Sequence, residues 1–468
     1  MKFLRQCCCR IFSNEKVVAC VMEQEFSHYG FVTTDFPMKT YPLIERWCRV
    51  LVLGFALACS IAQAVENAPQ PTEAGIVAAG FSVERLHRLD AVIEGEIARQ
   101  QLGGGIMYIA RDGRPVQFKT YGRQDIENNV PMRADAIFRI ASMSKAITSV
   151  AVMMLYEEGR FMLNDPVAKY LPAFANPVVA MPAPAGSPEG VKYVTEKARR
   201  PITIRDLLRH TAGLTYGDGL AAEAYKKEGF TNWYILGNNE TLAQVVDRIA
   251  ALPLHGHPGE NWQYGYSTDV LGRLIEVISG QSLDKFIEQR ITGPLGMSDT
   301  SFFLPPEKAS RLANVYGIKN GQLLLQESAA TSDFIHGPRK CFSGGAGMLS
   351  TTADYARFLQ MLLNGGEIDG VRLLSPKTVE LMHANHLGDK FHGEADGFGL
   401  GFWVNVHQGA VGEIGTEGAY GWGSAYFPQY VVDPKERLVI LFMAQHRPTG
   451  GSNLNQLIKV LTYQALIK

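Results

Sequence analysis

Cysteine is almost absent from most of this sequence. Six of the seven cysteines lie within the first sixty residues, and only Cys341 follows them. That distribution excludes a disulfide framework and a cysteine-based metal site in the rest of the chain. The roughly 400 residues that remain are enough to bury a stable core without such cross-links.

The sequence also lacks an excess of charge. It has 45 Lys and Arg against 46 Asp and Glu, a formal net charge of −1, and the basic residues are scattered. Binding to nucleic acid needs a clustered basic surface, so we expect no nucleic-acid partner. At 46% hydrophobic and 19% charged residues, the composition is typical of a soluble globular protein.

Several catalytic and cofactor motifs are missing as well. There is no Gly-x-Ser-x-Gly elbow, which argues against an α/β-hydrolase, and no Walker or dinucleotide motif between a strand and a helix. The histidine pairs His255/His257 and His383/His386 have no convincing third ligand. We therefore expect neither a cofactor nor a metal.

Residues 1–64 are predicted to be a leader rather than part of the fold. Lys39, Arg46 and Arg49 precede an apolar run, residues 50–58, that is too short to span a bilayer comfortably. This pattern is typical of a secretory signal peptide whose true start is Met38.

The predicted cleavage site is Ala62-Gln63-Ala64, so the mature chain is expected to begin near Val65 and to be periplasmic or secreted without stable membrane insertion. A cytoplasmic extension with a membrane anchor is the alternative. A lipoprotein attached through Cys59 fits less well, because Leu57 stands where a small residue is usual.

Strands are predicted at both ends of the remaining chain. Residues 81–100 have the pattern of a helix that begins after Ser82, and the Asp112-Gly113 turn then joins two β-rich runs. Near the C-terminus, residues 399–406, 424–433 and 437–445 predict strands. A last helix is predicted over residues 453–466.

The segment between these strands is mainly helical in pattern and contains Pro- and Gly-rich loops such as residues 175–190. The sequence therefore predicts a largely antiparallel sheet domain from residues 76–140 and 330–468. Residues 141–329 would form an inserted, mainly helical domain. A ligand site is expected between the two.

A Ser-x-x-Lys motif begins at residues 13, 142 and 282. The first copy lies in the leader. In the third, Ser282 is expected to cap a helix, with Lys285 exposed in its first turn. The middle copy precedes apolar residues with the spacing of a packed helix. These are Ile147, Val150, Ala151, Met154 and Leu155.

Ser142 and Lys145 are three residues apart, a spacing that brings two side chains together at the head of a helix. A lysine buried there can serve as a base, and the helix N-terminus favours an oxyanion. The alternative is an N-cap serine beside a solvated lysine, and the motif alone does not exclude it.

Residues 138–148, "FRIASMSKAIT", resemble the nucleophile motif of class C β-lactamases, penicillin-binding proteins and family VIII carboxylesterases. Further segments resemble the same superfamily in the same order. They are residues 163–172, 202–214, 294–302 and 344–358. The resemblance implies the β-lactamase-like α/β fold: an antiparallel sheet flanked by helices, with an inserted helical domain.

The resemblance also implies site residues. It makes Ser142 the nucleophile and Lys145 and Tyr264 the groups that move its proton, with Tyr266 as the competitor for the tyrosine position. Trp422-Gly423-Ser424 stands where the superfamily usually has Lys-Thr-Gly, and the implied oxyanion hole is formed by the backbone amides of Ser142 and Ala425.

Two departures from β-lactamases bear on the substrate. Tyr266 replaces an asparagine that grips an amide, and Trp422 replaces a lysine that grips a carboxylate. We therefore expect an exported serine carboxylesterase that forms an acyl-enzyme on Ser142 and acts on uncharged esters with a short or apolar acyl group or an apolar alcohol part. The alternatives are a D,D-peptidase or weak β-lactamase, and a non-catalytic binding protein with the same fold. The sequence leaves the oligomeric state open.

Overall fold

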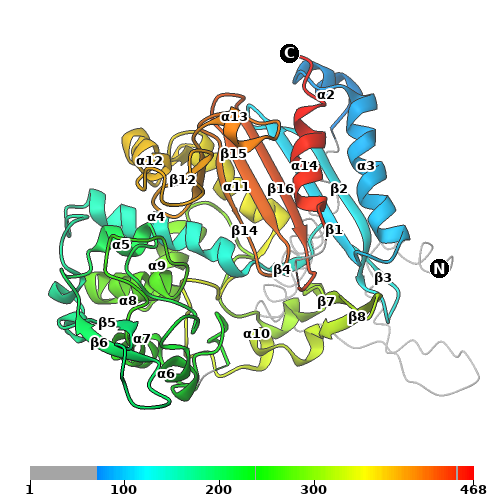
Figure 1. Ribbon diagram of the computed structural model, residues 1–468. Helices are drawn as coiled ribbons and strands as arrows, with labels where there is room; N and C mark the ends of the chain where they lie inside the picture. Colours follow the sequence, from blue (N-terminus) through cyan, green and yellow to red (C-terminus); the bar gives the residue numbers. More distant parts are fainter. Residues whose placement is uncertain (1–70, 238, 449–451) are drawn as a thin grey trace, which may run out of the picture. The chain divides into compact units, whose positions relative to one another are not determined.

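An eight-stranded antiparallel sheet occupies the centre of the fold, in the order β12-β13-β14-β15-β16-β1-β2-β3 (Figure 1). The predicted hairpin joins β1 (Gly104–Arg111) to β2 (Arg114–Asp125), and β1 also pairs with β16 (Leu438–Ala444). The N- and C-terminal segments therefore share one sheet, as predicted. The remaining strands are β3 (Val130–Pro131), β12 (Asp396–Phe398), β13 (Trp403–Asn405), β14 (Tyr420–Gly423) and β15 (Gln429–Asp433).

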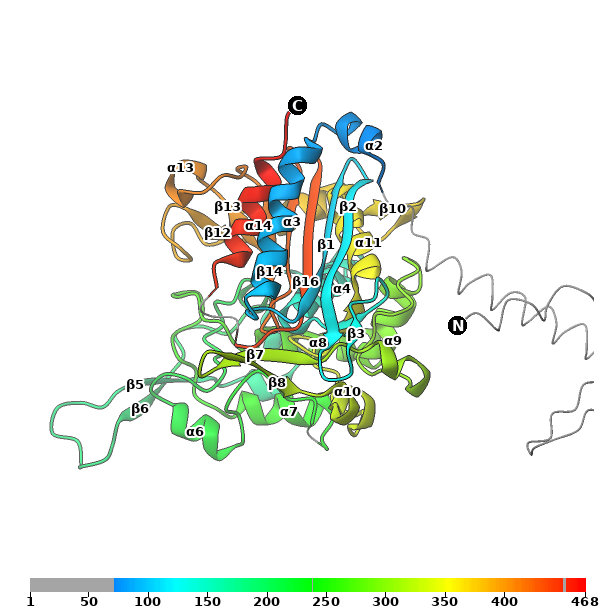
Figure 2. The same ribbon diagram turned by 90° about the vertical axis from the view of Figure 1, so that its right-hand side faces the viewer.

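Both faces of this sheet are buried, which explains the unbroken apolar sequence of β16. Leu438, Ile440 and Phe442 pack against α3 (Val83–Ala98) and α14 (Leu454–Tyr463). The alternate residues of β16 face the second core, which includes α11 (Thr352–Leu363). Figure 2 shows α3 and α14 side by side over one face and α11 on the other.

The predicted first helix is confirmed as α3. The Ser82 hydroxyl accepts a hydrogen bond from the Arg85 amide at 3.3 Å, and Leu86, Leu89 and Ile93 are buried. An N-cap of this kind satisfies one of the unpaired amides at the start of the helix. The amphipathic spacing then places the apolar stripe against the sheet.

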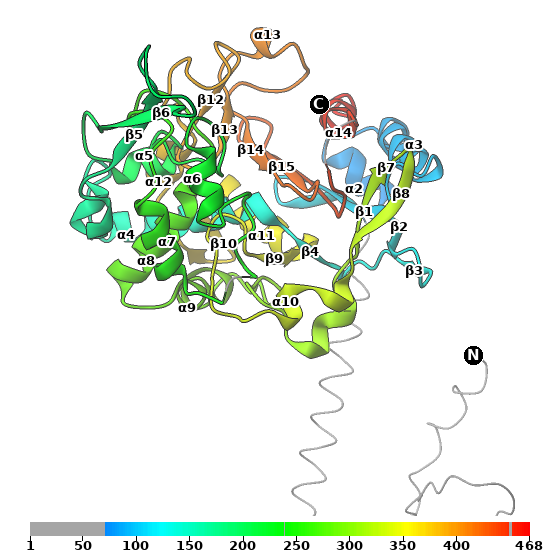
Figure 3. The same cartoon turned by 60° about the horizontal axis from the view of Figure 1, so that its bottom comes forward.

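Helices dominate the segment between the two parts of the sheet (Figure 3). They are α4 (Ser144–Glu157), α5 (Ile204–Leu208), α6 (Ala222–Lys227), α7 (Leu242–Ala250), α8 (Ser267–Ser279), α9 (Leu283–Ile287) and α10 (Asp333–His336). Three further short helices complete the described chain: α2 (Glu73–Ala78), α12 (Pro376–His383) and α13 (Gln408–Val411).

Short hairpins interrupt this helical segment. Residues 175–190, which were expected to be a loop, contain β5 (Val178–Pro182), and β5 pairs with β6 (Tyr193–Lys197). That expectation was wrong, because Val178 and Val179 favour extended backbone and find a partner strand beyond the turn. The other small pairs are β4 (Ile137–Arg139) with β9 (Leu349–Thr351), β7 (Val315–Lys319) with β8 (Gln322–Glu327), and β10 (Glu367–Ile368) with β11 (Val371–Arg372).

The computed structural model describes residues 71–237, 239–448 and 452–468. The predicted leader, the Met38 start, the cleavage site and the first Ser-x-x-Lys copy lie outside these ranges. By internal contacts, Ala64–Lys468 forms one compact unit, and its division into a sheet domain and a helical domain stays a prediction. None of the helices in the described ranges has the length and apolar character needed to cross a bilayer.

Candidate active site

Ser142 lies in a short 3-10 turn, Ala141–Met143, that leads directly into α4. The serine therefore lies two residues before the α-helix begins, at its head as expected. Ala141 has a φ of +36°, which is uncommon for a residue with a side chain and marks local strain beside the serine. The Tyr355 hydroxyl donates to the Met143 carbonyl at 2.9 Å and holds this turn in place.

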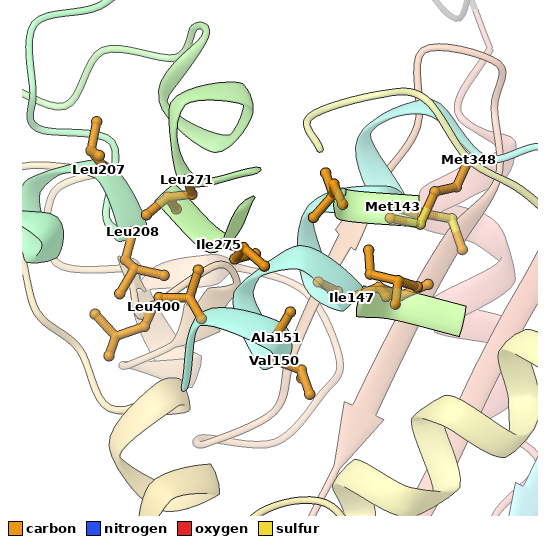
Figure 4. Packing of buried hydrophobic residues seen from close by; sticks show 14 of the residues in the cluster. Met143, Ile147, Val150, Ala151, Leu207, Leu208, Leu271, Ile275, Met348 and Leu400 are labelled. Atoms are coloured by element: carbon orange, nitrogen blue, oxygen red, sulfur yellow. The ribbon is translucent and has the colours of Figure 1, made fainter. Parts of the chain in front are cut away.

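Helix α4 is buried on all sides over Ser144–Leu155, not only along the predicted apolar face. Figure 4 shows Ile147, Val150 and Ala151 packed among side chains from α5, α8 and the segment at Leu400. A helix enclosed in this way does not fray at its first turn. The neighbouring Ser142 is consequently held in a fixed position.

Lys145 is 2% exposed. Its Nζ lies 3.2 Å from Ser142 Oγ and donates to the Gly345 carbonyl at 2.8 Å. The alternative of a solvated lysine is thereby excluded for this copy of the motif. In the copy at residue 282, Lys285 is exposed, as expected, and pairs with Glu288 at 2.7 Å. Ser282 was expected to cap the helix, but its side chain makes no capping hydrogen bond.

A buried carboxylate positions the carbonyl that holds Lys145. Asp269 Oδ1 accepts hydrogen bonds from Ser343 Oγ at 2.6 Å and from the Gly345 amide at 3.1 Å. Burial raises the pKa of Asp269 despite these bonds and the nearby Lys145. Gly345 is required here, because a Cβ would lie 2.6 Å from Asp269 Oδ2. Sequence reasoning did not identify Asp269.

Tyr264 lies beside the Ser142–Lys145 pair. Lys145 Nζ is 4.6 Å from the centre of the Tyr264 ring, and Trp422 Nε1 donates to the Tyr264 hydroxyl at 3.1 Å. The ring also stacks on Trp262, with centroids 5.6 Å apart. The structure thus brings the Ser142–Lys145 pair, Tyr264 and Trp422 together from three separate segments.

Tyr266 does not occupy the substrate-facing position that the sequence suggested. It is fully buried, its hydroxyl donates to the Asn232 carbonyl at 2.5 Å, and burial raises its pKa. Gly265 explains the separation, because a Cβ there would lie 2.3 Å from the Leu214 carbonyl, so the chain passes close to that segment. With no surface free for a ligand, Tyr266 packs against Tyr216 instead.

Two more side chains of this region were not assigned to the site from the sequence. Tyr216 lies with its ring centre 5.8 Å from Lys145 Nζ and packs edge-on against Tyr264. His210 packs against Tyr264 at 4.9 Å and is buried; burial and the charge of Lys145 hold its pKa well below the usual value. Its Nδ1 has no hydrogen-bond partner within the described residues.

The end of β14 forms another wall of the site, and this strand contacts the 3-10 turn of Ser142. Residues Trp422, Gly423, Ser424 and Ala425 are partly exposed, whereas the residues on either side are buried. Ser424 Oγ accepts a hydrogen bond from the Tyr426 amide at 3.1 Å, so it shapes the turn that carries Ala425. The roles of these residues in substrate binding and in an oxyanion hole stay predictions.

A cavity of about 580 Å³ adjoins this group, but Ser142, Lys145 and Tyr264 do not line it. It reaches the group through Trp262, Trp422 and Gly423. The hydrogen bonds of Lys145, rather than the position of the cavity, therefore single out Ser142 as the candidate nucleophile. Across the described ranges, no three His, Cys, Asp or Glu side chains are grouped as metal ligands.

Comparisons with known proteins agree with this geometry. The Beta-lactamase family model matches residues 89–462. Protein Rv1367c of Mycobacterium tuberculosis is 34% identical over 362 residues, which cover 74% of this chain and 86% of that protein. Esterase EstB of Burkholderia gladioli is 30% identical over 390 residues, which cover 78% and 91%.

A solved structure shows the same architecture. The structure of EstCE1, described as a hydrolase with promiscuous acyltransferase activity, superposes with a TM-score of 0.69 at 26% identity, covering 82% of this chain and 98% of that one. The predicted fold is confirmed by the sheet and by this neighbour. The chain therefore belongs to the beta-lactamase family and is a hydrolase with the serine β-lactamase and penicillin-binding-protein fold.

Proposed function

We propose that this protein is an exported serine carboxylesterase that cleaves uncharged esters through an acyl-enzyme on Ser142. The observation that carries the proposal is the buried Lys145, whose Nζ lies 3.2 Å from Ser142 Oγ and 4.6 Å from the centre of the Tyr264 ring. A nucleophile, a base and a second proton carrier in contact are the minimum for covalent acyl transfer. The predicted signal sequence supports export.

In the acylation step, Ser142 Oγ attacks the ester carbonyl carbon and its proton passes to Lys145. The oxygen of the tetrahedral intermediate is stabilised by the backbone amides of Ser142 and Ala425. The bond between the carbonyl carbon and the alkoxy oxygen then breaks. Tyr264 donates a proton to the departing oxygen and recovers one from Lys145, so the alcohol leaves neutral.

In the deacylation step, a water molecule takes the place of the alcohol beside Tyr264. Tyr264 and Lys145 accept its proton as it attacks the acyl carbon, and the proton returns to Ser142 Oγ when the acid leaves. The fixed position of α4 serves both steps, because the same two hydrogen-bonding groups must face the serine each time.

The groups at the site favour an ester over a charged substrate. Trp422 presents an indole where a substrate carboxylate would need a cation, and the indole N–H donates to the Tyr264 hydroxyl. A buried carboxylate without a cationic partner is strongly disfavoured. The 30% identity to an esterase agrees with this choice.

Intact-mass measurement tests the proposal directly. Brief exposure to a short-chain ester should add one acyl group to the protein, and peptide mapping should place that group on Ser142. The same exposure to a penicillin and to a D-Ala-D-Ala peptide serves as the comparison. Adducts from those two compounds without an ester adduct would instead identify a D,D-peptidase or β-lactamase.

Tyr264→Phe is expected to lower kcat for ester hydrolysis by about 10²–10⁴-fold, because the variant keeps the ring but cannot move a proton. Tyr266→Phe is the matched control, since Tyr266 is buried and bonded to a carbonyl. Its effect should fall on stability, at about 1–2 kcal/mol, with kcat close to that of the parent. A larger loss of kcat in Tyr266→Phe than in Tyr264→Phe would exchange the two assignments.

A further inference from the structure

The cavity that borders Trp262 and Trp422 extends away from Ser142, Lys145 and Tyr264, along the sheet toward α14. Its walls combine aromatic residues, among them Trp262, Phe391 and Trp403, with aliphatic residues such as Val431 and Ile458. A volume of about 580 Å³ lies within the range of pockets that hold whole small molecules. It is much larger than a short acyl chain requires.

The position of the cavity indicates which part of an ester enters it. Two of its walls, Trp262 and Trp422, are the side chains that stack on Tyr264 and donate to its hydroxyl. In the proposed mechanism, Tyr264 protonates the departing alkoxy oxygen. The alcohol part therefore lies on the Tyr264 side of the ester bond, which is the side where the cavity opens.

The charges in the cavity wall are already paired with one another. Lys459 Nζ lies 2.5 Å from Glu413 Oε2, and His392 Nδ1 lies 3.7 Å from Asp396 Oδ2. No cation is thus left to neutralise a ligand carboxylate among the described residues that line the cavity. An uncharged ligand avoids the desolvation cost that an unpaired charge would bring.

We propose that this cavity is the alcohol subsite, and that the preferred esters carry a bulky, uncharged, mainly apolar alcohol. The inference rests on the proposed function, because Tyr264 places the alcohol. In the acylation step the cavity holds the alkoxy group while the Ser142–acyl bond forms, and it releases the neutral alcohol afterwards.

A series of butyrate esters tests the proposal, since the acyl group stays constant and every leaving group is a primary alcohol. Relative to ethyl butyrate, (2-naphthyl)methyl butyrate should raise kcat/KM at least about tenfold through apolar contact in the cavity. A 6-carboxylate should remove the gain, because no free cation awaits it.

Cavity-filling substitution provides the second arm. Val411 lines the cavity, whereas Val406, five residues earlier in the chain, is 41% exposed and does not. Val411→Trp should lower the naphthylmethyl-to-ethyl ratio of kcat/KM at least about fivefold. Val406→Trp should leave that ratio unchanged. Equal ratios for ethyl and naphthylmethyl esters, unaffected by Val411→Trp, would overturn the alcohol subsite.

Calorimetric binding separates this proposal from the proposed function. Ser142→Ala protein should bind 2-naphthylmethanol, and Val411→Trp in the same background should weaken that binding. Binding without any ester hydrolysis in the parent protein would refute the esterase and keep the cavity as a site for such alcohols. Ester hydrolysis by the parent protein, with no binding of 2-naphthylmethanol and no preference for the naphthylmethyl ester, would keep the esterase and overturn the alcohol subsite.

Discussion

Ser142→Ala is expected to lower kcat/KM for a short-chain ester by at least about 10⁴-fold, because no acyl-enzyme can form. Ser142 is partly exposed, and within the described residues its hydroxyl makes a side-chain hydrogen bond only with Lys145, so folding should be little affected. The measurement is initial-rate hydrolysis, with the melting temperature recorded for both proteins.

Ser282→Ala is the matched control for that experiment. Ser282 begins the same Ser-x-x-Lys spacing, lies at the start of α9 and makes no capping hydrogen bond. Its removal should leave kcat/KM within about twofold of the parent. Substantial activity in Ser142→Ala would remove the serine from its role and favour a non-catalytic binding protein or a different nucleophile.

Lys145→Met is expected to lower kcat by about 10²–10⁴-fold, because methionine keeps the length of the side chain but cannot accept the serine proton. Since Ser142 and Lys145 act as a unit, the double variant should be no slower than Ser142→Ala by itself. Single-turnover acylation, followed by intact mass, isolates the affected step.

Stability should respond differently from activity in this variant. Removing Lys145 leaves the Gly345 carbonyl without its donor, which costs about 1–3 kcal/mol. It also removes a buried amine whose desolvation opposes folding, so the two effects oppose each other. We expect a change in melting temperature of a few degrees at most. Lys285 is exposed and paired with Glu288, so Lys285→Met should change neither the melting temperature nor kcat appreciably.

Retention of most activity in Lys145→Met would contradict its role as the base. The groups then to be examined are Tyr264, on whose ring Lys145 lies, and Asp269, which holds Gly345. Asp269→Asn distinguishes a positioning effect from a proton-transfer effect, since the amide keeps an acceptor oxygen. A lowered kcat with an unchanged pH profile would indicate positioning.

Much of the fold was accessible from local pattern. The helix after Ser82, the turn at Asp112-Gly113 and the strand ending near Ala444 were each predicted from capping, turn chemistry or an apolar run. Strand β5, within residues 175–190, was missed because the prolines and glycines there suggested a loop. Its pairing partner, β6, lies beyond those residues.

Within the site, the sequence identified the members more readily than their surroundings. Tyr264 and Tyr266 are two residues apart and chemically identical, yet one borders Lys145 and the other is bonded to Asn232. That difference depends on how the chain passes Leu214, which no local pattern encodes. Asp269 was missed for the same reason, since its partners Ser343 and Gly345 are distant in the sequence.

The sequence by itself determined the family, the alternation of elements and the presence of a Ser-x-x-Lys motif ahead of an apolar helix, because these depend on residues close together in the chain. Only the tertiary structure decided which copy of the motif carries a buried lysine. Burial of Lys145 requires α4 to be enclosed by segments remote in sequence, whereas Lys285 remains in water on α9. Desolvation and long-range packing make that choice, and neither is visible in a local pattern.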